Sequence, residues 1–145
     1  MKPIEVTRVI ERPLEEVFRF AGDSENNPKW LGVFEKVQKT SEGPLGVGTT
    51  FKDVARLMGR RFETQSEVTD YVPNRMYARR VTTGPFPAAV RIEFEPVDKG
   101  TRVRLISTAE ARGFLKLAEP LLRMQTERQL KDGMDRLKAM MEAGA

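Results

Sequence analysis

The sequence predicts an α+β fold in which a seven-stranded, curved antiparallel sheet surrounds one long C-terminal helix, with two short helices after the first strand. Two observations predict this class. Turn signals recur at short intervals between segments whose apolar residues alternate, which is typical of an antiparallel meander. After Gly113 the apolar spacing changes to three and four residues and stays helical to about Glu142. The length of 145 residues and the absence of a linker indicate a single domain over residues 1–145.

The first strand is expected at residues 3–11, where Ile4, Val6 and Ile10 share one face. Pro13 suits the first position of a helix, because that position needs no backbone N–H. A short amphipathic helix is therefore predicted over residues 14–21. The polar cluster at 23–28 predicts a turn and another short helical segment that leads to Trp30.

Six further strands follow from alternating segments that end in glycine, proline or asparagine turns. They are expected around residues 34–40, 51–57, 62–68, 76–82, 90–94 and 103–107. Apolar residues alternate with charged ones in most of them, so the sheet needs cover on one face only. The long C-terminal helix is the expected cover.

The C-terminal helix has two apolar stripes that do not share a face. The first is Phe114, Leu117, Leu121 and Met124, and the second is Leu130, Met134, Leu137 and Met141. They differ in direction by about 220° at 100° per residue. Pro120 is expected to start or kink the main helix. The first stripe either lines a cavity, packs on the short helices or forms a dimer patch, and we favour the cavity.

Composition excludes several chemistries. The chain has no cysteine and no histidine, so it has no disulfide, no thiolate or imidazole metal ligand and no Ser-His-Asp triad. No metal or cofactor is expected. The net charge is +4 with both signs interspersed, which favours a solvated surface over a nucleic-acid interface. No signal peptide and no run of about 18 apolar residues is present, so a cytoplasmic location without a membrane span is expected.

Polar residues on the apolar faces of the strands predict a ligand cavity between sheet and helix. Asp53, Thr64, Ser66 and Ser107 are the polar members. A buried Asp53 requires a cation, which either Arg79 or Arg80 supplies. Asp53 is also the one candidate catalytic base. The candidate ligand-binding residues are Trp30, Asp53, Thr64, Ser66, Tyr77, Arg79, Phe86, Phe94, Leu105, Ser107, Leu117, Leu121 and Met124.

Four stretches in this order carry a family resemblance, at residues 11–18, 23–30, 43–49 and 119–138. Over essentially the whole chain they resemble the helix-grip fold of the START/polyketide cyclase-like (SRPBCC) superfamily. The resemblance implies an internal cavity for a lipid, sterol, plant hormone, polyketide or quinone. It implies no invariant catalytic residue, so none is assigned here on that ground.

Three functions are compatible with these observations. The first is binding or transport of a small hydrophobic ligand, of lipid, polyketide or aromatic type. The second is a polyketide cyclase or dehydrase that uses carboxylate, arginine and tyrosine groups. The third is a protein-interaction module that uses the same groove. The absence of histidine and cysteine favours the first and third over the second, because general acid–base catalysis most often uses histidine.

Overall fold

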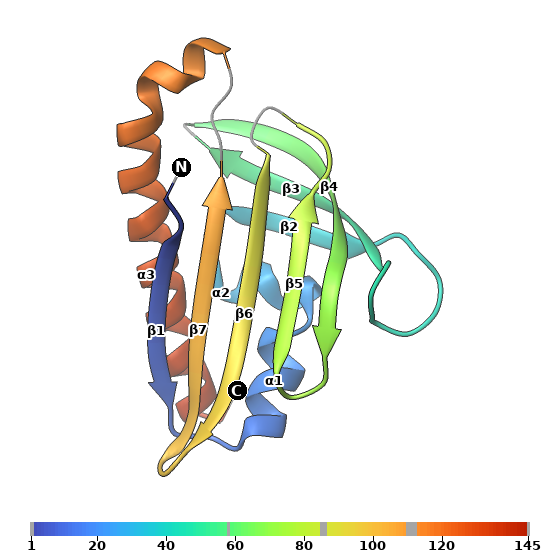
Figure 1. Ribbon diagram of the computed structural model, residues 1–145, viewed down its shortest axis with the longest axis vertical. Coiled ribbons are helices and arrows are strands. Elements are labelled where there is room, and N and C mark those ends of the chain that lie inside the picture. The colour runs from blue at the N-terminus through green and yellow to red at the C-terminus, as the bar shows by residue number, and fades with distance from the viewer. Residues whose placement is uncertain (1, 58, 85–86, 110–112, 145) are drawn as a thin grey trace.

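The computed structural model describes residues 2–57, 59–84, 87–109 and 113–144. Its elements follow the predicted order of strand, short helices, six strands and long helix (Figure 1). They are β1 (Ile4–Ile10), α1 (Leu14–Ala21), the 3-10 turn η1 (Ser24–Asn26), α2 (Asn27–Trp30), β2 (Phe34–Lys39), β3 (Thr50–Leu57), β4 (Arg60–Val72), β5 (Met76–Val81), β6 (Ala88–Val97), β7 (Gly100–Ala109), η2 (Gly113–Ala118) and α3 (Glu119–Glu142). The predicted fold class is confirmed.

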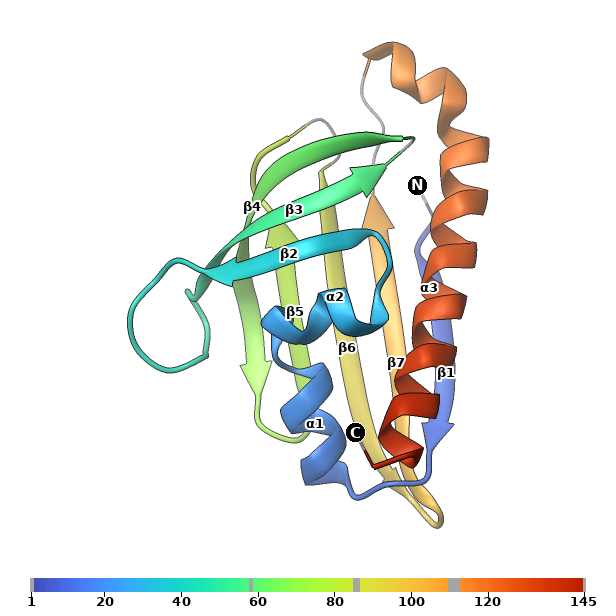
Figure 2. The same ribbon diagram turned by 180° about the vertical axis from the view of Figure 1, so that it is seen from behind.

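The seven strands form one antiparallel sheet in the order β1-β7-β6-β5-β4-β3-β2. Consecutive strands are neighbours from β2 to β7, and β1 closes the order by pairing with β7. The sheet bends so that β2, β3 and β4 turn across its concave side (Figures 1 and 2). The helix α3 runs along β1, while α1 and α2 lie at the same concave side (Figure 2).

Apolar side chains of the concave face form the core with the C-terminal half of α3. Met134, Leu137 and Met141 are buried there against strand residues such as Val6 and Leu105. The apolar stripe predicted from Leu130 to Met141 is therefore the face that packs. α1 contributes Val17, Phe18 and Ala21 to the same core.

A glycine lets α2 approach α3 closely. A Cβ atom on Gly133 would lie 2.9 Å from the backbone oxygen of Trp30 and 2.8 Å from Leu31 Cδ2. Arg136 Nη1 donates a hydrogen bond to that same Trp30 oxygen at 3.0 Å. These contacts hold the segment after α2 against the helix, and that segment forms part of the site described below.

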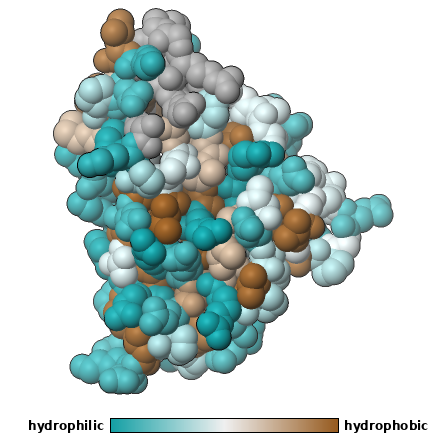
Figure 3. All heavy atoms as spheres, viewed as in Figure 1, coloured by the Kyte–Doolittle hydropathy of each residue, from teal (hydrophilic) through white to brown (hydrophobic). Residues whose placement is uncertain are grey.

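The convex face carries matched charges among a smaller number of apolar residues. Arg104 bonds Glu5 at 2.9 Å and Glu93 at 3.1 Å, so one guanidinium links β1, β7 and β6. Figure 3 shows hydrophilic side chains over much of this side, with hydrophobic ones between them. No helix in the described ranges is both long and apolar enough to cross a membrane.

Pro120 starts the long helix and does not kink it. It occupies the first turn of α3, after the 3-10 lead-in η2, where its missing N–H breaks no helical hydrogen bond. Three strands extend beyond their expected bounds. β4, β6 and β7 include polar residues next to the turns, because the hairpin ladders continue through them.

Candidate ligand-binding site

A cavity of about 180 Å³ lies between the concave face of the sheet, the α2–β2 segment and the N-terminal half of α3. It is smaller than the roughly 300–1,000 Å³ of pockets for drug-sized ligands. Most of its walls are apolar. They include Ile4, Leu31, Val33, Phe34, Ala55, Leu57, Phe62, Val81, Ala88, Val90, Ile92, Leu105, Ala109, Leu122 and Leu130. Such walls favour an apolar occupant of modest size.

Arg79 is the buried charged residue of the cavity wall. Its Nη1 lies 3.2 and 3.3 Å from the two carboxylate oxygens of Asp53 and donates to Ser66 Oγ at 2.9 Å. Its guanidinium carbon lies 5.0 Å from the centre of the Phe34 ring, in cation–π range. The Arg79 and Asp53 side chains are 5 % and 0 % exposed. The guanidinium is thus held on one side by a carboxylate and on another by an aromatic ring.

Strand register explains why these groups meet. Asp53 on β3 stands opposite Thr64 on β4, and Arg79 on β5 stands opposite Val68. Alternation along β5 turns Arg79 to the concave face and leaves Arg80 exposed. Arg79, not Arg80, is therefore the cation that pairs with Asp53.

Tyr77 precedes Arg79 by two residues and lines the same cavity. Its hydroxyl shares a hydrogen bond with the buried Ser24 hydroxyl of η1. Burial raises the pKa of Tyr77 above its ordinary value, although the nearby Arg79 and the Ser24 bond act against this shift. The phenol therefore stays protonated at neutral pH and able to form hydrogen bonds.

Asn27 adds a polar group from α2. It lines the cavity with 4 % of its surface exposed, and its Oδ1 is buried without a hydrogen-bond partner in the described part of the chain. An unpaired buried amide oxygen costs roughly 1–3 kcal/mol. Being fully buried, this oxygen is out of reach of an occupant.

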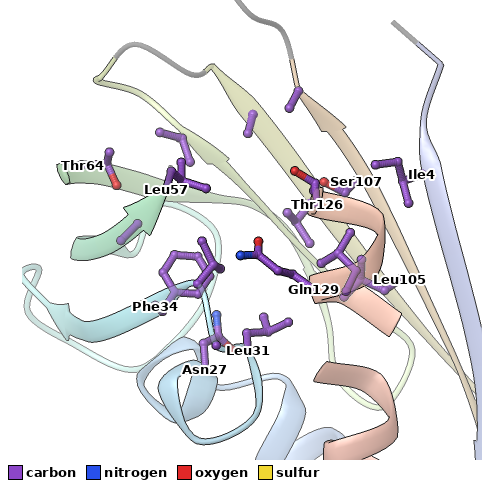
Figure 4. A pocket seen from close by; sticks show the side chains of 18 of the residues that line it. Ile4, Asn27, Leu31, Phe34, Leu57, Thr64, Leu105, Ser107, Thr126 and Gln129 are labelled. Carbon is purple, nitrogen blue, oxygen red and sulfur yellow. The ribbon is translucent and has the colours of Figure 1, made fainter. Parts of the chain in front are cut away.

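The helix α3 contributes Thr126 and Gln129 to the opposite wall. Figure 4 shows the Gln129 side chain extending from the helix toward Phe34. The sequence analysis did not include these two residues, or Asn27, among the candidate ligand-binding residues. A signal for the helix residues was present, because extending the buried stripe backwards from Leu130 by four residues reaches Thr126.

The structure separates the residues predicted from the sequence into distinct groups. Thr64, Tyr77, Arg79, Leu105 and Ser107 line the cavity.

Asp53 and Ser66 lie behind Arg79 and are not part of the wall. Trp30 and Phe94 are core residues away from the cavity. Phe94 packs edge-on against Phe18 with 5.1 Å between ring centres. Asp53, engaged by Arg79 in this way, is not placed to reach an occupant as a base.

The first stripe of the helix does not line this cavity. Leu117, Leu121 and Met124 are 90 %, 48 % and 53 % exposed. Leu121 and Met124 point about 140° and 160° away from the mean direction of the α3 residues that line the cavity, at 100° per residue. The prediction that these residues line the cavity is therefore wrong. The face of α3 that lies toward the cavity is partly polar, with Thr126 and Gln129 on it. Association of two copies through them stays a prediction. Phe86 and the side chain of Phe114 lie outside the described residues.

No group of three or more acidic residues is placed to hold a metal ion in the ranges that the structure describes. The site consists of an apolar wall, the buried Arg79 paired with Asp53, a few hydrogen-bonding side chains, and Glu119 and Arg123 at the start of α3.

This fold and this cavity together define a helix-grip protein with an internal site between sheet and C-terminal helix. The chain belongs to the family described as polyketide cyclase / dehydrase and lipid transport, whose sequence model matches residues 1–142. This places it in the SRPBCC superfamily. A search of curated proteins finds no match.

Solved structures share the fold along the whole chain. The structure of TTHA0849 from Thermus thermophilus is 23 % identical with a TM-score of 0.83, and 99 % of each chain is covered. Ara h 8.0201 is 14 % identical with a TM-score of 0.73, over 98 % of each chain. The di-domain ARO/CYC StfQ from the steffimycin biosynthetic pathway is 13 % identical with a TM-score of 0.76. There 99 % of this chain matches 52 % of that one.

Proposed function

We propose that the chain binds a small, largely apolar molecule in the cavity, with a polar group of that molecule against Arg79. One observation carries the proposal. Arg79 lines the cavity, and its Nη2 and Nε have no acceptor among the described residues, while Nη1 is fully used. These donors are available to an acceptor inside the cavity. An occupant that brings an oxygen atom would accept hydrogen bonds from them.

Binding without turnover is the form that we propose. Asp53, the candidate base, is paired with Arg79 and absent from the cavity wall. A cyclase or dehydrase is the alternative, in which Tyr77 and Arg79 polarise a carbonyl of the ligand. The similarity to an ARO/CYC protein supports a test of this alternative but assigns no reaction. A groove for a partner protein is the further alternative.

The test is titration of the purified protein with 1-aminonaphthalene, a small neutral fluorophore whose emission shifts to the blue in apolar surroundings. Val90→Trp should fill the cavity from β6 and weaken binding by about tenfold or more. Val47→Trp is the matched control, because Val47 is 69 % exposed on the β2–β3 loop. Absence of binding to the native protein, or equal binding by Val90→Trp, contradicts the proposal.

The alternatives have their own readouts. Native mass spectrometry of the protein as purified should detect a bound small molecule if it acts as a carrier. Conversion of a poly-β-keto substrate by the native protein, lost in Tyr77→Phe, would establish the enzyme instead. Binding of a partner polypeptide that competes with 1-aminonaphthalene would establish the interaction module.

A further inference from the structure

We infer that the cavity selects a neutral, oxygen-bearing molecule over a carboxylate of the same skeleton, and that Asp53 sets this selection. The ligand class is a ketone, ester or phenol on an apolar frame. The inference rests on the proposed function, because it concerns the occupant of the same cavity.

The first step is the charge of Arg79. Both carboxylate oxygens of Asp53 lie within 3.3 Å of Arg79 Nη1, and Asp53 is fully buried. The guanidinium charge is thus neutralised before any ligand enters. A ligand carboxylate would be a second anion on one buried cation, and like charges at short range repel strongly where water is excluded.

The second step is the hydrogen bonding that remains. Within the described residues, the free donors of Arg79 are on Nη2 and Nε. A carbonyl or hydroxyl oxygen accepts from them without adding charge. Arg79 therefore acts toward the cavity as a donor of hydrogen bonds. The negative charge of Asp53 offsets most of its electrostatic attraction for a further anion.

The third step is Asn27. Its Oδ1 is fully buried and out of reach of an occupant, whereas Figure 4 shows the amide nitrogen on the side of Phe34, toward the cavity that the residue lines. That N–H group donates to an oxygen atom without adding charge. Asn27 and Arg79 together therefore favour an uncharged group that accepts hydrogen bonds.

The other charged residues of the wall do not alter the balance. Glu119 and Arg123, from the first turns of α3, also line the cavity. Arg123 donates to the backbone oxygens of Lys2 and Pro3. One carboxylate and one guanidinium at this end cancel each other in net charge, as Asp53 and Arg79 do.

The experiment compares ligands of equal shape and different charge. Acetophenone and benzoate form one pair, and 2-acetylnaphthalene and 2-naphthoate form a larger one. At neutral pH the acids are ionised, as carboxyl groups in water are. Displacement of 1-aminonaphthalene from the native protein gives each dissociation constant. We expect the neutral member of at least one pair to bind about tenfold tighter or more than its acid.

Asp53→Asn should shift this preference toward the carboxylate by about tenfold or more, because it leaves the Arg79 charge uncompensated. The amide keeps the shape and one acceptor oxygen. Asp135→Asn is the matched control. Asp135 makes an ion pair with an arginine at 2.6 Å, but on the exposed side of α3, so its loss should leave the ligand preference unchanged.

Several results would overturn the inference. They are a carboxylate that binds the native protein as tightly as its neutral partner in both pairs, failure of all four ligands to displace 1-aminonaphthalene, and an unchanged preference in folded Asp53→Asn. If Asp53→Asn does not fold by circular dichroism, the ligand pairs on the native protein decide. Failure of 1-aminonaphthalene itself to bind rejects the proposed function, which keeps the two failures distinct.

Discussion

Arg79 and Asp53 are both removed from water, and each is the only countercharge at hydrogen-bond distance from the other in the described residues. Removing one partner of a buried pair leaves an unpaired charge inside the protein. Replacing both by apolar residues of similar size removes the desolvation cost together with the attraction. The pair is therefore better understood as a constraint on the site than as a source of stability.

Asp53→Ala should lower the free energy of unfolding by about 3–5 kcal/mol, because the guanidinium stays buried. The double variant Asp53→Leu/Arg79→Met should recover most of this loss. Urea unfolding followed by circular dichroism measures both. Asp135→Ala, at an exposed ion pair, should change stability little, since solvent screens that pair. A double variant no more stable than Asp53→Ala would contradict this account.

Tyr77 gives stability a dependence on alkaline pH. Burial raises the pKa of Tyr77 above 10.0 in the folded protein, so its phenol ionises more readily when the chain unfolds. The stabilisation is fully present below pH 10 and is lost as the pH rises through the folded pKa.

Tyr77→Phe should therefore flatten the fall in unfolding free energy above pH 10. Below that pH it should cost about 1 kcal/mol, through loss of the hydrogen bond with Ser24. Chemical denaturation across the pH series measures this. The same alkaline slope in both proteins would show that Tyr77 is not the titrating group.

At the scale of elements, α3 has a packing face, a cavity face and an exposed apolar stripe. Leu137 belongs to the first and is fully buried, whereas Leu121 belongs to the last. Leu137→Ala should lower the free energy of unfolding by about 2–5 kcal/mol through the lost contacts and the cavity created. Leu121→Ala should change it by less than about 0.5 kcal/mol. Equal costs in urea unfolding would mean that the faces are assigned wrongly.

The elements were largely predictable because their signals are local. Alternation at Ile4 and Val6, the proline at 13 and the glycine turns are properties of neighbouring residues. The bounds of β4, β6 and β7 were harder to predict, because the hydrogen bonds of a hairpin extend as far as the partner strand allows. The sequence resemblance also pointed to the family that the matching model confirms.

The cavity was predictable only in part. The alternating faces of β4, β5 and β7 identified Thr64, Arg79 and Ser107. Which groups meet across the cavity depends on the bend of the sheet and on the position of α2. Neither leaves a local pattern, so Asn27 and Gln129 were missed. The exposed stripe of α3 was misassigned because an apolar residue was taken to face inwards, although folded proteins expose many apolar atoms.

At the scale of the whole molecule, nearly every ionic contact lies on the outside and the cavity is uncharged overall. Glu35, for example, bonds Arg56 and Arg61 at 3.1 and 2.7 Å on the outer side of β2, β3 and β4. Exposed networks of this kind contribute little individually. They keep the convex face polar, which leaves the concave face as the place where apolar surface concentrates.

The pairing of β1 with β7 joins Ile4 to Ser107, whereas the other strand pairs join neighbours in the chain. Long loops must close before such a contact forms, so proteins rich in them fold slowly, in milliseconds to seconds. We expect β1 to dock after the β2–β7 meander has formed. Val6→Ala should then mainly accelerate unfolding and leave the refolding rate nearly unchanged in stopped-flow measurements. In this account, the first strand of the sequence is the last strand to join the sheet during folding.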